Sequence, residues 1–363
     1  MKKILSIVFS VIILILFPIN CYAEEDDFSS VYDIIPNEVK DTLIDTEYEI
    51  DSFQDVIDII SNDGVFALIK VAFSDYSLPF KSVLTLLLIL TISSSLQLLI
   101  EKPETKKIAQ IICSLIICVT IAEPLKNIIF SVTECLNSSG VFMFSFLPIF
   151  ASFLVTSNPG TSAVAYTSTT YFFTEITVFV SKSVLTPLSA SIFTMKVVSS
   201  VSDGIFNNLL NSVKKLIIWI LGLITSIFTA ITSVQSIITS AADTVAIKTG
   251  KFIVGSSVPV VGGYVGEVMN TVIGSLTVMK SGIGLFAIIV IVIMFLPVIA
   301  ELLVWKIGIK LCQVISFGTE NDIGQGIIVA FDDVITVLLS ATICVFIGMV
   351  LSISAILVFG GVK

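Results

Sequence analysis

Residues 283–304 read IGLFAIIVIVIMFLPVIAELLV, and Glu301 is the one charged side chain among these 22 residues. A helix of this length rises about 33 Å, enough to cross the roughly 30 Å hydrocarbon core of a bilayer. Similar apolar runs lie at about 82–100, 108–130, 140–157, 161–181, 183–201, 216–234 and 334–359. The pattern predicts an all-α, polytopic helical membrane protein, with spans one to six in residues 81–234 and the C-terminal spans in 281–363.

The composition supports this class and excludes several functions. The 363 residues are 55% hydrophobic and 13% charged, whereas soluble domains carry about 25% charged residues. There is no His, and all 19 basic residues are Lys, so the common general base, the usual zinc ligand and the bidentate Arg clamp are absent. A net charge of −9 without a basic stripe disfavours nucleic-acid binding. With no P-loop or HExxH motif either, we expect no enzyme activity, metal or cofactor.

The first residues have the pattern of a secretory signal peptide. Lys2 and Lys3 precede an apolar run over residues 4–17, and Cys21 and Ala23 occupy the −3 and −1 positions of a small-residue cleavage site. We expect cleavage after Ala23, which would remove residues 1–23. An uncleaved membrane anchor is the alternative.

Residues 24–80 form an acidic segment that differs from everything after it. Between residues 24 and 76, 15 acidic residues stand against Lys40 and Lys70, a net charge of −13. Apolar positions recur at helical spacing from Val39 to Ile60. The pattern predicts a small helical domain outside the cytoplasm and near the membrane. Its acidic face is either a solvated surface or a docking surface for a partner.

Lysines between the predicted spans indicate the orientation of the chain. A cleaved signal peptide leaves the mature N-terminus outside, so the first span runs inward and the lysines of residues 102–107 face the cytoplasm. This agrees with the positive-inside rule. Alternating crossings then place Lys214 and Lys215, and later Lys306 and Lys310, on the same side.

Residues 235–280 are rich in glycine and carry charges. They lie between an outward and an inward span, so they either stay outside or cross an even number of times. Irregular backbone at membrane depth is tolerated only where protein or a water-filled cavity covers it. We therefore expect a re-entrant hairpin or a broken-helix pair, with tight packing and no pore as the alternative. The candidate pore or packing residues are Lys248, Lys251, Gly255, Pro259, Gly262, Gly263 and Gly266.

Ionisable side chains in or beside the spans are costly in a bilayer and often mark function. Glu175 and Lys196 lie in adjacent predicted antiparallel spans, but their depths differ by about 10 Å, so we do not expect them to pair. Glu301 and the pair Asp332-Asp333 are expected at membrane interfaces. The cysteines fit buried small hydrophobes.

The stretch AADTVAIKTGKFIVGSSVPVVGGYVGEVMNTVIGS, residues 241–275, resembles the stage III sporulation protein AE family. The likeness rests on Lys251-Phe252, on Gly255, on residues 258–262 and on residues 270–273. The order of signal peptide, acidic external segment and multiple spans is also similar. Family members commonly carry Arg near this block, where this chain has Lys.

The resemblance implies a membrane subunit of the sporulation channel complex that links mother cell and forespore and is needed for late forespore development. It places the chain in the mother-cell membrane around the forespore, with the N-terminal domain in the intermembrane space. The implied partners are other membrane and ring-forming proteins of the same operon, a secretion-type ATPase, a forespore membrane protein and the lipid bilayer. A homo-oligomer is compatible with this role. The alternative function is a stand-alone secondary transporter of a small solute.

Overall fold

The computed structural model of the chain describes residues 34–36, 39–40, 77–157, 161–180, 183, 185–201, 208–231, 234, 262–316 and 321–359. The helices are α6 (Ser77–Leu99), α7 (Pro103–Ser157), α8 (Thr161–Val180), α9 (Thr186–Val201), α11 (Gly262–Ser316) and α12 (Asp322–Phe359). A further helix covers Asn208–Ile231 and is called the 208–231 helix. No strand occurs among the described residues, which confirms the predicted all-α fold. The predicted signal peptide with its cleavage site at Ala23, and most of the acidic segment, lie outside them.

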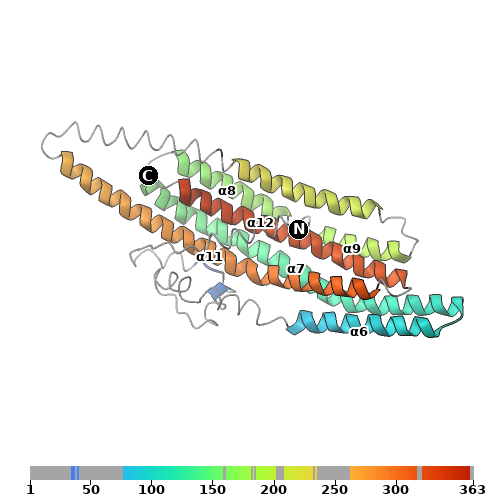
Figure 1. The fold of residues 1–363 in the computed structure, drawn as a ribbon. Helices are drawn as coiled ribbons and strands as arrows, with labels where there is room; N and C mark the ends of the chain where they lie inside the picture. Colours follow the sequence, from blue (N-terminus) through green and yellow to red (C-terminus); the bar gives the residue numbers. More distant parts are fainter. Residues whose placement is uncertain are drawn as a thin grey trace.

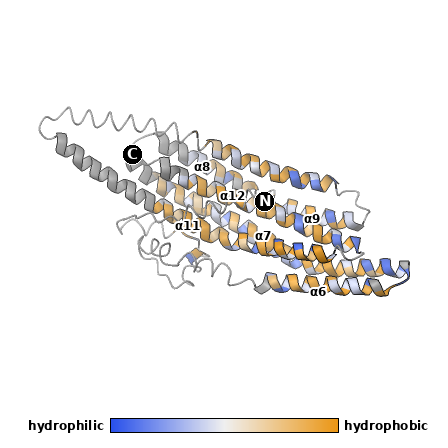
Figure 2. Cartoon of the chain, viewed as in Figure 1, coloured by the Kyte–Doolittle hydropathy of each residue, from blue (hydrophilic) through white to orange (hydrophobic). Residues whose placement is uncertain are grey.

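Five of the described helices are long and apolar enough to cross a membrane. The segments are Pro79–Gln97, Glu104–Ala151, Asn208–Ile231, Ile283–Ser316 and Asp322–Ser354. Large apolar side chains remain exposed along them, for example from Phe80 to Leu99 on α6. Exposed apolar surface on this scale is typical of contact with lipid, and Figure 2 shows that the helices are apolar along most of their length. The chain is a multi-pass membrane protein, as its sequence predicts.

Helix α12 lies at the centre of the bundle. It packs against α11, α9, α7 and α8, while α6 packs against α7 and α11 (Figure 1). Its buried side chains are consecutive in the middle of the helix: each residue from Ala330 to Ile335 is no more than 7% exposed. Because successive residues point about 100° apart, this stretch is covered on every side. Helix α12 therefore forms the core to which the other helices dock.

A side-chain cap starts α12 and joins it to α7. The Oδ1 atom of Asn321 accepts a hydrogen bond from the backbone N–H of Gly324 at 3.0 Å. The same atom accepts one from the hydroxyl of Ser114 on α7 at 3.1 Å. An Asn at this position satisfies one of the free N–H groups of the first helical turn. Because Asn321 and Ser114 are buried, the cap also fixes the register of α12 against α7.

Helix α7 is one continuous element where the sequence predicts two spans. The apolar runs 108–130 and 140–157 are separated by polar residues, and this drop in hydropathy led to the prediction of two spans. In the structure the Thr133 hydroxyl donates to the carbonyl of Ile129 at 2.7 Å, and the Ser139 hydroxyl to that of Leu136 at 2.9 Å. A helix accommodates such residues because their hydroxyls bond to its own carbonyls. The prediction of two separate spans is wrong here.

Helices α8 and α9 follow one another in the same direction and do not form the predicted antiparallel pair over 161–181 and 183–201. Phe173 of α8 faces Gly348 near the end of α12, whereas Ser200 of α9 faces Gly326 near its start. The two helices therefore run antiparallel to α12 along its length as one interrupted pass (Figure 1).

The last part of the glycine-rich block is helical. Gly262, Gly263 and Gly266 lie in the first turns of α11, which continues without a break to Ser316. A hairpin turn or helix break of the predicted kind would therefore lie before Gly262. The other candidate residues of the block are outside the described part of the chain and are Lys248, Lys251, Gly255 and Pro259.

Replacing Gly326 with Val should destabilise the packing of α12 on α9. A Cβ atom at Gly326 would collide with the Ser200 side chain and lie 3.6 Å from the Ser200 Cα atom, so the two helices would have to separate. Overpacking of this kind costs about 1–3 kcal/mol. We expect the thermal midpoint of the purified protein in detergent to fall by several degrees. Gly222→Val is the matched control, because nothing lies within 4 Å of a Cβ atom there. Equal losses in the two variants would contradict the close contact.

Candidate functional site

Asp333 of α12 binds two lysines from different helices. Its Oδ2 atom pairs with the ammonium group of Lys196 on α9, and its Oδ1 atom pairs with that of Lys214 on the 208–231 helix. Lys196 also donates a hydrogen bond to Oδ1 of Asn211 at 3.1 Å. Both carboxylate oxygens of Asp333 are therefore in use, and one side chain ties three helices together.

Asp332, the preceding residue, binds two lysines of α11. Its Oδ1 atom lies 2.6 Å from Nζ of Lys306, and its Oδ2 atom lies 3.0 Å from Nζ of Lys310. Lys306 also donates to the hydroxyl of Thr336, which donates in turn to the Asp332 carbonyl at 2.6 Å. Lys310 donates to Oε1 of Gln313 at 2.9 Å. Every carboxylate oxygen of the two aspartates thus has a lysine partner.

These two clusters form a continuous charged layer across the bundle, which we call the lysine–aspartate layer. Its members are Lys196, Lys214, Lys306, Lys310, Asp332 and Asp333. Four of them are only 4–8% exposed, whereas the side chains of Lys214 and Lys310 are 23% and 55% exposed. The layer has four ammonium groups and two carboxylates, so its net charge is positive.

Helical spacing explains how the layer forms. Lys306 and Lys310 are four residues apart, so they lie on one face of α11. Asp332 and Asp333 are consecutive, so their side chains point about 100° apart around α12. One aspartate therefore faces α11, while the other faces α9 and the 208–231 helix. Removing one partner from such a buried pair is strongly unfavourable, because the remaining charge is left without compensation.

These residues lie too far apart in the sequence for their spacing to predict the contacts between them. The prediction that Glu175 and Lys196 do not pair is confirmed, since Lys196 binds Asp333 and Glu175 is exposed on α8. The reason differs from the one expected, because α8 and α9 run in the same direction. Asp332 and Asp333 were predicted at an interface without their lysine partners. The sequence does contain a hint of the pairing. Asp332 and Asp333 are adjacent in an apolar segment, and pairs of lysines occur at the ends of other predicted spans.

A second polar region lies between the middle parts of α7 and α11. A cavity of about 310 Å³ is lined there by Ser131, Glu134 and Ser138 of α7, together with Pro297 of α11 and Val39 of the acidic segment. Ser131 also donates to Oε2 of Glu301 at 3.5 Å. The polar residues between the two apolar runs of α7 therefore line a cavity that is open to the surface beside the exposed side chain of Glu134.

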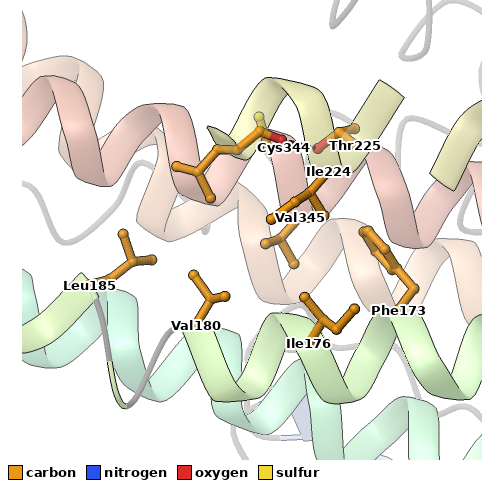
Figure 3. Close-up of a pocket in the computed structure, with 9 residues that line it drawn as sticks. Phe173, Ile176, Val180, Leu185, Ile224, Thr225, Cys344 and Val345 are labelled. Carbon is orange, nitrogen blue, oxygen red and sulfur yellow. Dashed lines mark hydrogen bonds between the residues drawn. The ribbon is translucent and has the colours of Figure 1, made fainter. Parts of the chain in front are cut away.

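A smaller space lies between α8, α12 and the 208–231 helix (Figure 3). Its volume is about 20 Å³, and its walls are mostly apolar, with Phe173 and Val180 on one side and Val345 on another. This is about the room that one water molecule needs. Such a space fits a packing defect between helices better than a substrate site.

Within the described ranges, no three His, Cys, Asp or Glu side chains gather as a metal site would require. The lysine–aspartate layer contains the ion pairs that the described part of the bundle shows, and it is the candidate functional site.

Comparison with known proteins identifies the family. The sequence profile of stage III sporulation protein AE matches residues 46–360. The chain belongs to this family. The match includes the whole lysine–aspartate layer and the glycine-rich block, and it confirms the resemblance noted in the sequence. The stage III sporulation protein AE of Bacillus subtilis (strain 168) is 23% identical over 242 residues, which cover 64% of this chain and 61% of that protein. The chain thus aligns with less than two thirds of this relative's length. No solved structure gives a significant match.

Proposed function

We propose that this chain is a membrane subunit of a sporulation channel and transport complex that links mother cell and forespore, and that it supports late forespore development. The observation that carries the proposal is the lysine–aspartate layer. Its paired charges hold α9, α11, α12 and the 208–231 helix in one arrangement. A bundle fixed in this way suits a rigid scaffold on which other subunits assemble.

Membership in the family supports the proposed setting. The chain would lie in the mother-cell membrane around the forespore, with its acidic N-terminal domain in the intermembrane space. Its partners would be other membrane and ring-forming proteins of the same operon, a secretion-type ATPase and a forespore membrane protein. The glycine-rich block would line a passage or pack subunits together. No catalytic role is included in this proposal.

A stand-alone secondary transporter is the second candidate, and the cavity beside Glu134 favours it. Its volume of about 310 Å³ lies within the range of small-molecule sites. A transporter must rearrange around its site during each cycle. The four ion pairs of the lysine–aspartate layer hold α9, α11, α12 and the 208–231 helix together and oppose such movement, and this favours the scaffold.

Affinity purification from sporulating cells distinguishes the two functions. We expect the tagged chain to co-purify with other membrane proteins of its operon, and its deletion to arrest forespore development after engulfment, as scored by microscopy. Cells with the chain but without those partners should show the same arrest. Full solute uptake by the purified chain alone in vesicles, together with normal sporulation in the partner deletions, would contradict the scaffold and support the transporter.

A further inference from the structure

The positive charge of the lysine–aspartate layer is not balanced within the layer. Both oxygens of Asp332 and both oxygens of Asp333 already have lysine partners. Four ammonium groups therefore share two carboxylates, and Lys215, which follows Lys214 on the same helix, adds a further positive charge. Excess charge in a membrane bundle is costly unless an anion approaches it. The partly exposed side chain of Lys214 is where such an anion can reach the layer.

Next to Lys214, the 208–231 helix presents a stripe of exposed side chains. Lys215 is exposed and none of the ion pairs among the described residues includes it. Trp219, one turn further, is 66% exposed. Exposed Trp and Lys in neighbouring turns are typical of the level where lipid headgroups meet hydrocarbon.

Beyond Trp219 the same helix exposes apolar side chains. Leu216 is 56%, Leu223 is 37% and Ile227 is 52% exposed. These positions share a face with Lys215 and Trp219, because they recur at steps of three and four residues. This helix therefore presents a positive end followed by an apolar stripe about 20 Å long. An anionic phospholipid is complementary to it, because its phosphate can lie at the positive end and its acyl chains along the apolar stripe.

We propose that the exposed edge of the lysine–aspartate layer binds the phosphate headgroup of an anionic phospholipid, between Lys214 and Lys215. The acyl chains lie along Leu216, Leu223 and Ile227. Lys310, whose side chain is also largely exposed, adds to the positive field at the headgroup. This site does not depend on the proposed function, because it requires the membrane alone and no other protein.

Binding of cardiolipin to the purified full chain in a neutral detergent tests the site. We expect cardiolipin to raise the thermal midpoint of the wild-type protein, and Lys215→Gln to weaken its affinity about fivefold. Lys215→Glu, which changes the charge at this position by two units, should weaken it about 30-fold, which corresponds to about 1 kcal/mol per unit charge. The Lys215 side chain is exposed and belongs to none of the four ion pairs of the layer, so both variants should fold. Lys107→Gln removes an exposed lysine of α7 and should bind as the wild type does.

Three outcomes would overturn the proposal. Unchanged affinity in Lys215→Glu would place the lipid elsewhere. Equal stabilisation by phosphatidylcholine with the same acyl chains would mean that headgroup charge plays no part. Equal stabilisation by inorganic phosphate at the same concentration would mean that the site takes a free anion and does not select a lipid.

Discussion

Replacing Asp333 with Leu should lower the free energy of unfolding by about 3–5 kcal/mol, because it leaves a buried lysine without its carboxylate. Lys196 is the side chain most affected, since it is 4% exposed and pairs with Asp333. Lys214 contributes less, because its partly exposed ammonium group can turn toward solvent. The measurement is the midpoint of thermal unfolding of the purified protein in detergent, followed by size-exclusion chromatography.

Two further variants separate loss of charge compensation from a general defect in α12. Asp322→Asn changes an exposed aspartate in the first turn of the same helix, and we expect a loss of less than about 1 kcal/mol. Asp333→Leu combined with Lys196→Met removes both members of the buried pair, and apolar replacements of such pairs are often close to neutral. A double variant as unstable as Asp333→Leu alone would refute the role of the uncompensated Lys196 charge. A stable double variant that fails to sporulate would show that the pair has a function beyond stability.

Replacing Phe146 with Ala should cost about 3–5 kcal/mol, the second large loss that the structure predicts. Phe146 is fully buried on α7, with ring centroids 5.6 Å from Phe142 and 5.2 Å from Phe150. The substitution leaves a cavity in the middle of this stack. Close packing matters in a membrane bundle because the hydrophobic effect contributes little to helix association in lipid. The same thermal measurement in detergent reports the loss.

Phe130→Ala is the matched control for this variant. Phe130 lies on the same helix but is 65% exposed, so lipid or detergent replaces its contacts. We expect a change within about 0.5 kcal/mol. If the two alanine variants lose equal stability, the Phe142–Phe150 stack is not part of the packed core.

The class of the fold could be predicted from the sequence because its apolar runs are long enough to span a bilayer. In lipid, a helix satisfies all backbone hydrogen bonds within such a run. The connections could not, because hydropathy does not distinguish a turn from polar residues within a bundle. Thr133 and Ser139 satisfy their hydroxyls inside α7, and α8 and α9 run on in one direction. The continuity of α7 removes one predicted crossing, and the single pass formed by α8 and α9 removes another. Two fewer crossings leave the later segments on the same predicted side of the membrane. This agrees with the structure, in which Lys214 and Lys306 lie in one layer.

The lysine–aspartate layer could not be predicted because its pairs join residues far apart in the sequence. Lys196 and Asp333 are 137 positions apart, and spacing along the chain says nothing about which helices become neighbours. The glycine-rich block gave the opposite result. Its sequence identified the family, yet Lys248 through Pro259 lie outside the described residues, so its predicted role stays a prediction.

The continuity of α7 also has a mechanical consequence. A helix of 55 residues is about 80 Å long, more than twice the thickness of the hydrocarbon core. It acts as a stiff strut, and bending concentrates at Pro124 and Pro148, where the backbone lacks an N–H donor. Because α7 packs against α6, α8, α11 and α12, a displacement of its Pro103 end shifts the helices that pack along it.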